Sequence, residues 1–162
     1  MDLAMQQSGS AVERVRAALD AAGVAAEIRR FDASTRTAQD AADAIGTTVG
    51  QIVKSLLFLS GDRAVLALVS GANQVDAEKL ASLTGASIRK ADASVVRQAT
   101  GYTIGGVPPL GFPSRIETYV DQDLLTYDVI WAAAGTPNDV FRTTPAELLR
   151  MTGGVAADLR RE

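Results

Sequence analysis

A single cation, Lys54, lies inside the largely apolar run from Gln51 to Phe58. The run has the composition of a buried strand, and side chains alternate across a strand, so Lys54 shares a face with Ile52 and Leu56. Burying an ammonium among such neighbours is costly unless an anion or an oxygen-rich ligand compensates. Lys54 is therefore a candidate functional group. The alternative is a packed methylene stem whose ammonium reaches water at the end of the strand.

A second unusual stretch, residues 101–112, contains four glycines and two prolines. Prolines restrict the backbone and lack an amide donor, so this segment is predicted to be neither helix nor central strand. Glycines let a ligand approach the backbone closely and leave amides unshielded. The pattern indicates a preformed binding loop, and a rigid connector at a sheet edge is the alternative.

The chain contains no cysteine and no histidine. Disulfides, cysteine nucleophiles, Ser-His triads and thiolate or imidazole metal sites are therefore excluded. Covalent catalysis by Ser55 is disfavoured, because neighbouring strand residues point to opposite faces and Lys54 is poorly placed to activate it. Asp121, Asp123 and Asp128 lack the glycine and glutamate of a calcium loop, so we expect no metal and no cofactor. Lysine, carboxylates, backbone amides and bound water remain for chemistry.

The net charge of -3 argues against a large basic footprint on nucleic acid. We therefore expect no DNA partner, although one end of an RNA could still be bound. No segment has the apolar length of a membrane span, and the first ten residues lack the features of a secretory signal. The sequence predicts a cytoplasmic protein with no membrane partner.

The elements that must position Lys54 and the loop follow from hydrophobic spacing, capping residues and glycine stops. Helices are predicted at 11–22, 37–45, 76–83, 92–100 and 144–152, and strands at 24–31, 51–58, 64–70, 87–90, 115–120, 129–134 and 140–143. Tight turns near Gly61 and Gly135 predict two hairpins. The fold class is α/β of the α+β type, with a mixed, mostly antiparallel sheet surrounded by short helices. At 162 residues one domain is expected over 10–162, after a flexible segment 1–9 and with a peripheral tail beyond Gly154.

The strand Gln51–Leu56, Gly101 with Tyr102, and the segment Gly105–Gly111 occur here in the order found in a known family. In these motifs the chain resembles the YbaK family of aminoacyl-tRNA deacylases, which is similar to the editing insertion domain of bacterial prolyl-tRNA synthetase. The resemblance covers nearly the whole chain. It implies a YbaK-like fold and hydrolysis of the ester between a wrong amino acid and tRNA, without metal or cofactor.

The resemblance also implies roles for particular residues. Lys54 matches the essential lysine of the family, and the substrate loop is matched by Gly105, Gly106, Pro109 and Gly111. Further substrate contacts are expected at Ile52, Leu56, Gly101, Val107, Pro108 and Gly135. Ala133 stands where some relatives have serine, and Phe112 where some have lysine or histidine.

The physical interpretation is that amides near Gly105 and Gly106 hold the ester carbonyl, while Lys54 anchors the terminal adenosine or its phosphate. Either a water or the 2′-hydroxyl of the tRNA makes the attack. The partner is then the acceptor end of an aminoacyl-tRNA, with tRNA-Pro carrying a small amino acid as the expected substrate. Gly106→Ala is expected to cost only ~1 kcal/mol of stability, as in a surface loop.

Two other functions remain open from the sequence: a non-catalytic module of the same fold that binds aminoacyl-tRNA or a small molecule, and a small-molecule ester or amide hydrolase. The edited amino acid, contact with the tRNA body and the oligomeric state also stay open, with a homodimer as one candidate.

Overall fold

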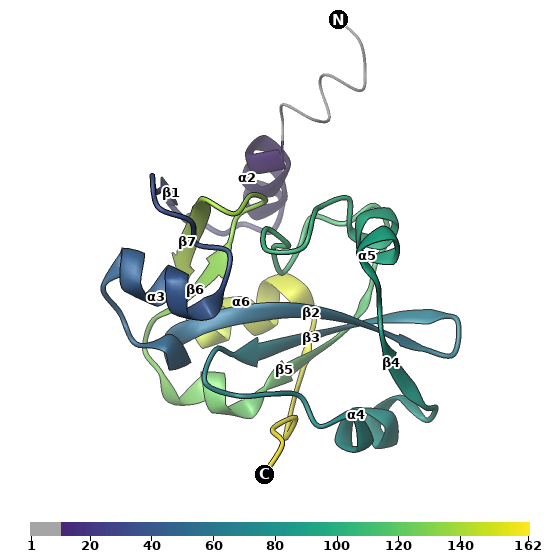
Figure 1. Ribbon diagram of the computed structural model, residues 1–162. Helices are drawn as coiled ribbons and strands as arrows, with labels where there is room; N and C mark the ends of the chain where they lie inside the picture. Colours follow the sequence, from purple (N-terminus) through teal and green to yellow (C-terminus); the bar gives the residue numbers. More distant parts are fainter. Residues whose placement is uncertain (1–10) are drawn as a thin grey trace, which may run out of the picture.

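The computed structural model describes residues 11–162, so the predicted flexible segment 1–9 and Ser10, which the sequence predicts as the cap of the first helix, lie outside the described residues. Within this range, eight strands form one mixed sheet with α-helices packed around it (Figure 1). The strands are β1 (Ile28–Arg30), β2 (Ile52–Ser60), β3 (Arg63–Ser70), β4 (Ile88–Lys90), β5 (Glu117–Asp121), β6 (Ile130–Ala133), β7 (Asp139–Thr143) and β8 (Val155–Ala157). The helical elements are α2 (Ala11–Ala21), α3 (Ala38–Ile45), α4 (Ala77–Thr84), α5 (Ala93–Thr100), α6 (Pro145–Thr152) and the 3-10 turns η1 (Val49–Gln51) and η2 (Gln122–Thr126).

The long hairpin of β2 and β3 lies at the centre of the sheet, as predicted. Its register places Lys54 opposite Val69, and Gly61 closes the turn with a φ of 62°. The strand order is β1-β7-β6-β2-β3-β5-β8, with β4 paired to β2. β2 pairs with β6, β3 with β5, and β5 with β8 in parallel, while the remaining pairs are antiparallel. The predicted fold class is confirmed.

Capping residues begin and end the helices where the sequence predicts. The N-caps Thr37, Asp76, Asp92 and Thr144 each accept a hydrogen bond from a backbone amide in the first helical turn. Glycines in the left-handed region end α3, α4, α5 and α6. No helix in residues 11–162 has the length and apolar character needed to cross a membrane.

The two faces of the sheet carry different helices. The largest core cluster joins one face to Val15 of α2, Val96 of α5 and Leu148 of α6. The opposite face packs against α3 through Ala41 and against α4 through Leu80. Lys54 belongs to this second face, since its register partner Val69 lies in the cluster around Leu80.

The predicted strand 24–31 is wrong in length. Only Ile28–Arg30 forms a strand, because β7 offers partners to these three residues and no more. The amide of Val24 instead donates a hydrogen bond to the carbonyl of Leu19, at the end of α2.

The prediction of a peripheral tail is also wrong. Residues Val155–Ala157 form β8, which pairs in parallel with β5, and Leu159 is fully buried beside Leu80. Arg160 then forms an isolated antiparallel bridge with Val75. The tail covers a sheet edge whose backbone groups would otherwise be unpaired, which a local pattern of three apolar residues does not reveal.

Leu159→Ala should lower the free energy of unfolding by about 2–5 kcal/mol, because it removes a fully buried side chain from the core. Val155→Ala is the matched control in the same tail, since Val155 is 57% exposed, and it should change little. Urea unfolding of both variants measures the difference. If Leu159→Ala changes the free energy of unfolding as little as Val155→Ala does, the tail contributes nothing to the core.

Candidate active site

A cavity of about 320 Å³ opens where β2 and β6 diverge. The two strands pair only at Ile52 with Trp131 and at Val53 with Ala132, so beyond these positions the sheet is split. The cavity is bounded by these strands, by the start of α3 with the segment before it, and by the loop at 104–107. Its size is at the small end of the range for ligand pockets, and its walls are mostly apolar.

Lys54 extends from β2 into the wall of this cavity, and its side chain is half-buried. The ammonium donates a hydrogen bond to the main-chain carbonyl of Asn73, which follows β3. Burial lowers the pKa of Lys54 from its ordinary value, and the negative charge of Asp121 partly opposes that shift. No ion pair involves this ammonium within residues 11–162, so it is a partly desolvated cation at a cavity and not simply an exposed surface lysine.

The glycine loop contributes Gly105 and Val107 to the cavity, but it is not a surface loop. Val107 and Leu110 belong to the main core, and Gly106 is buried. The amide of Gly106 donates to the carbonyl of Thr103 at 3.0 Å, so it is already satisfied within the loop. A Cβ on Gly106 would lie 2.8 Å from the Cα of Thr136, which corrects the expected mild stability cost of Gly106→Ala.

Gly105 is placed differently from its neighbour. Its φ is 94°, and its amide has no hydrogen-bond acceptor among residues 11–162. It lines the cavity together with Arg36, whose side chain packs directly against it. Of the two glycines proposed as amide donors, Gly105 is therefore the one whose amide is free for a ligand.

Five of the predicted site residues line the cavity: Ile52, Lys54, Leu56, Gly105 and Val107. Six do not: Gly101, Gly106, Pro108, Pro109, Gly111 and Gly135. Gly101 ends α5 as its C-cap, and Gly111 offers its carbonyl to the Tyr102 hydroxyl at 3.2 Å. Gly135 packs against Ala11 of α2 with a φ of 104°. These glycines shape and support the loop and turn, which explains why they look like site residues in the sequence.

Several cavity residues were missed by the sequence analysis, notably Arg36, Thr35 and Trp131. Trp131 is the one tryptophan of the chain, and its ring lies 5.6 Å from the guanidinium carbon of Arg29 on β1. Its uniqueness was a usable signal. Arg36 stands in a polar loop ahead of α3, and nothing local links it to Gly105, about seventy positions later.

Ser55 also borders the cavity, and its buried Oγ has no hydrogen-bond partner among the described residues. Ser55 shares a strand face with Val53 and Leu57, which belong to the main core, and Lys54 lies on the other face. The hydroxyl is thus a candidate contact for a polar ligand atom, whereas a Lys54–Ser55 catalytic pair gains no geometric support.

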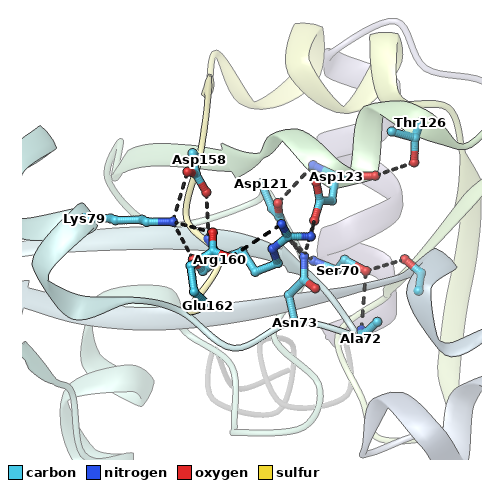
Figure 2. Close-up of polar contacts among 11 residues, drawn as sticks. Ser70, Ala72, Asn73, Lys79, Asp121, Asp123, Thr126, Asp158, Arg160 and Glu162 are labelled. Carbon is cyan, nitrogen blue, oxygen red and sulfur yellow. Dashed lines mark hydrogen bonds and ion pairs between the residues drawn. The ribbon is translucent and has the colours of Figure 1, made fainter.

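No group of three or more histidine, cysteine, aspartate or glutamate side chains that could hold a metal occurs within residues 11–162. Asp121 and Asp123 do lie close together, but both carboxylates accept hydrogen bonds from the side-chain amide of Asn73 (Figure 2). Asp121 is fully buried and caps η2.

The family model of the aminoacyl-tRNA editing domain matches residues 32–151, which include Lys54 and the glycine loop. The chain belongs to the aminoacyl-tRNA editing domain family. YwhH of Bacillus subtilis, an uncharacterised protein, is 32% identical over 123 residues, or 75% of this chain and 78% of YwhH. An Enterococcus faecalis protein named "Putative Cys-tRNA(Pro)/Cys-tRNA(Cys) deacylase EbsC" is 26% identical over 76% of each chain.

A crystal structure described as that of "a putative trans-editing enzyme for prolyl tRNA synthetase" is 47% identical and superimposes with a TM-score of 0.90. The match covers 94% of this chain and 98% of that one. The resemblance to the YbaK family and its link to the editing domain of prolyl-tRNA synthetase are therefore confirmed. The editing-domain family implies aminoacyl-tRNA as the class of substrate.

Proposed function

We propose that this editing domain acts in trans as a metal-independent deacylase, which removes a small wrong amino acid from tRNA, with tRNA-Pro as the preferred carrier. The observation that carries this proposal is that Lys54 and Gly105, whose amide has no acceptor among residues 11–162, line one small and mostly apolar cavity. A cation and an amide donor are the groups needed to bind an aminoacyl ester and to stabilise the negative charge that develops on its carbonyl oxygen.

In the proposed reaction, a water or the tRNA 2′-hydroxyl attacks the ester carbonyl carbon. The Gly105 amide holds the developing oxyanion, while Lys54 binds an oxygen of the terminal adenosine or its phosphate. The bond between the carbonyl carbon and the ribose oxygen then breaks, and the ribose oxygen takes a proton. With water as nucleophile the amino acid leaves directly. With the 2′-hydroxyl it first passes to that oxygen, and water then releases it.

Selection by size follows from the walls of the cavity. Ala38, Ala41, Ala132 and Ala133 contribute short side chains, and the enclosed volume is about 320 Å³. In the proposed reaction this mostly apolar pocket receives the short side chain of a wrongly attached amino acid, as the second site of a double sieve does. Alanine, serine, threonine and 2-aminobutyrate are the proposed occupants, and the name of EbsC adds cysteine.

The rim of the cavity offers contacts for the acceptor end of tRNA. Arg36 lines the cavity and is exposed, and Arg29 and Arg142 are exposed register partners of the lining residues Val140 and Trp131. None of these three arginines forms an ion pair within residues 11–162. Local positive charge can therefore bind one end of an RNA although the whole chain is acidic.

The proposal is tested by deacylation of tRNA-Pro charged with each candidate amino acid, with and without EDTA, beside the matching amino-acid methyl esters. We expect turnover of at least one mischarged tRNA, unchanged by EDTA and faster than that of the esters. Binding of the charged tRNA without turnover would instead support a non-catalytic module. Equal turnover of the methyl esters would support a small-molecule hydrolase.

Deacylation should decline at alkaline pH earlier than an ordinary lysine would allow. Burial lowers the pKa of Lys54. If the ammonium is the active form, activity is full below that lowered pKa and is lost as pH rises through it, below the ~10.4 of an unperturbed lysine. The measurement is kcat/KM against pH, corrected for spontaneous ester hydrolysis. Lys54→Arg stays charged, so an alkaline decline at the same pH in this variant would contradict the assignment.

A further inference from the structure

The Lys54 ammonium is held by a residue that has no place in the proposed chemistry. We infer that Asn73 is a positioning residue for Lys54, and that the C-terminal segment 158–162 supports it through Arg160. This inference rests on the proposed function for its kinetic consequences. Its structural basis is a chain of contacts from the tail through Asp123 and Asn73 to Lys54. Figure 2 shows the part of this chain from Arg160 to Asn73.

The side chain of Asn73 is clamped between two carboxylates. Its amide nitrogen donates to Asp121 and to Asp123, each at 2.8 Å. Asp121 is itself fixed, because it is fully buried and accepts from the Ser70 amide at 3.1 Å and the Asp123 amide at 3.0 Å. With its side chain held in this way, the main-chain carbonyl of Asn73 stays directed at Lys54.

The tail holds the same loop from the outside. Arg160 contacts the carboxylate of Asp123 at 3.2 Å and forms the bridge with Val75. Backbone hydrogen bonds also join Arg161 to the carbonyl of Gln74 at 2.8 Å and Asp76 to the carbonyl of Leu159 at 2.8 Å. The tail lies beyond residue 151, where the family match ends.

The acceptor for the Lys54 ammonium is a neutral carbonyl and not a carboxylate. A carboxylate bonded directly to Lys54 would neutralise the ammonium and compete with the substrate. A carbonyl acceptor restrains the flexible side chain but leaves its charge available. Asp121 contacts the side chain of Asn73 and not Lys54 itself. Its charge therefore favours the protonated lysine without forming an ion pair with it.

The test compares Asn73→Ala and Asn73→Asp with the wild type, and uses Thr126→Ala as a control. Thr126 donates to the main-chain carbonyl of Asp123 at 2.8 Å, so its loss perturbs the same turn without touching Asn73. Asn73→Ala should lower kcat about 10-fold with little change in KM, because a misaimed group slows the reaction more than it weakens binding. Thr126→Ala should match the wild type.

Asn73→Asp supplies a readout that a merely structural role would not move. At about pH 8 the new carboxylate repels the two neighbouring carboxylates, so activity should fall below that of Asn73→Ala. At lower pH the introduced carboxyl group becomes protonated and can donate again, so activity relative to wild type should recover. The cationic groups that contact this cluster are Lys54 and Arg160. Loss without recovery at low pH, or equal loss in Thr126→Ala, would overturn the inference.

A second measurement does not depend on activity. The rate at which an amine reagent labels Lys54 in the intact protein, followed by mass spectrometry, reports how firmly the ammonium is held. Asn73→Ala should speed this labelling several-fold and Arg160→Ala to a smaller extent, while the exposed Lys90 labels equally in all proteins. An unchanged rate at Lys54 would overturn the inference even if deacylation is observed. Faster labelling in a protein that deacylates nothing would remove the proposed function and leave the positioning intact.

Discussion

Lys54→Met is expected to lower the deacylation rate by about 100-fold or more, while the protein stays folded. The substitution removes the only cation that projects from β2 into the cavity and keeps a side chain of similar length. Lys54 is proposed to anchor the terminal adenosine or its phosphate, and losing the correct placement of a substrate can cost about 10²-fold in rate. Stability should not fall, because the ammonium is partly desolvated and forms no ion pair in the described chain, so an apolar replacement suits the site.

Lys90→Met is the matched control for that variant. Lys90 lies on β4, which pairs with β2, but its side chain is exposed and does not line the cavity. Deacylation of each mischarged tRNA, with the melting temperature of both variants, separates lost chemistry from lost folding. Wild-type turnover in Lys54→Met would end the assignment of this lysine.

Gly105→Ala is expected to cut turnover by more than about 10-fold and to lower stability by only about 1 kcal/mol. Gly105 has a φ of 94°, which alanine avoids, and a new Cβ would lie 2.5 Å from Cγ of Arg36. Arg36 is exposed and can rotate to relieve this contact, so the strain that remains is that of the backbone angle. The substitution would nevertheless reorient the amide of residue 105, and this amide is the group proposed to hold the oxyanion.

Gly106→Ala provides the comparison, because its neighbour cannot move. The new Cβ would meet the backbone of Thr136 at 2.8–2.9 Å, and the residue is buried. We expect this variant to lose about 1–3 kcal/mol of stability through overpacking. Thermal unfolding and turnover at a temperature where both variants are folded distinguish the two glycines. If Gly105→Ala turns over substrate like the wild type, the amide has no catalytic role.

Much of this fold could be predicted from the sequence, because the signals are local. Thr37, Asp76, Asp92 and Thr144 satisfy amides in their own helical turns, and a glycine in the left-handed region ends each of these helices. The β2–β3 hairpin follows in the same way from two apolar runs and a two-residue turn. The lysine in an apolar strand marks the site because the cost of burying an ammonium does not depend on the rest of the fold.

Only the tertiary structure decided which residues meet at that lysine. Arg36 and Gly105 come together because the loop folds back over the split between β2 and β6, a long-range arrangement with no local signature. The same packing turned Gly106 from an exposed amide donor into a buried contact with Thr136. Asn73 and Leu159 likewise acquired their roles through partners far along the chain. Capping and hairpin turns involve neighbours a few residues apart, whereas a cavity depends on the packing of the whole sheet, so the sequence alone determined the elements and the fold determined the site.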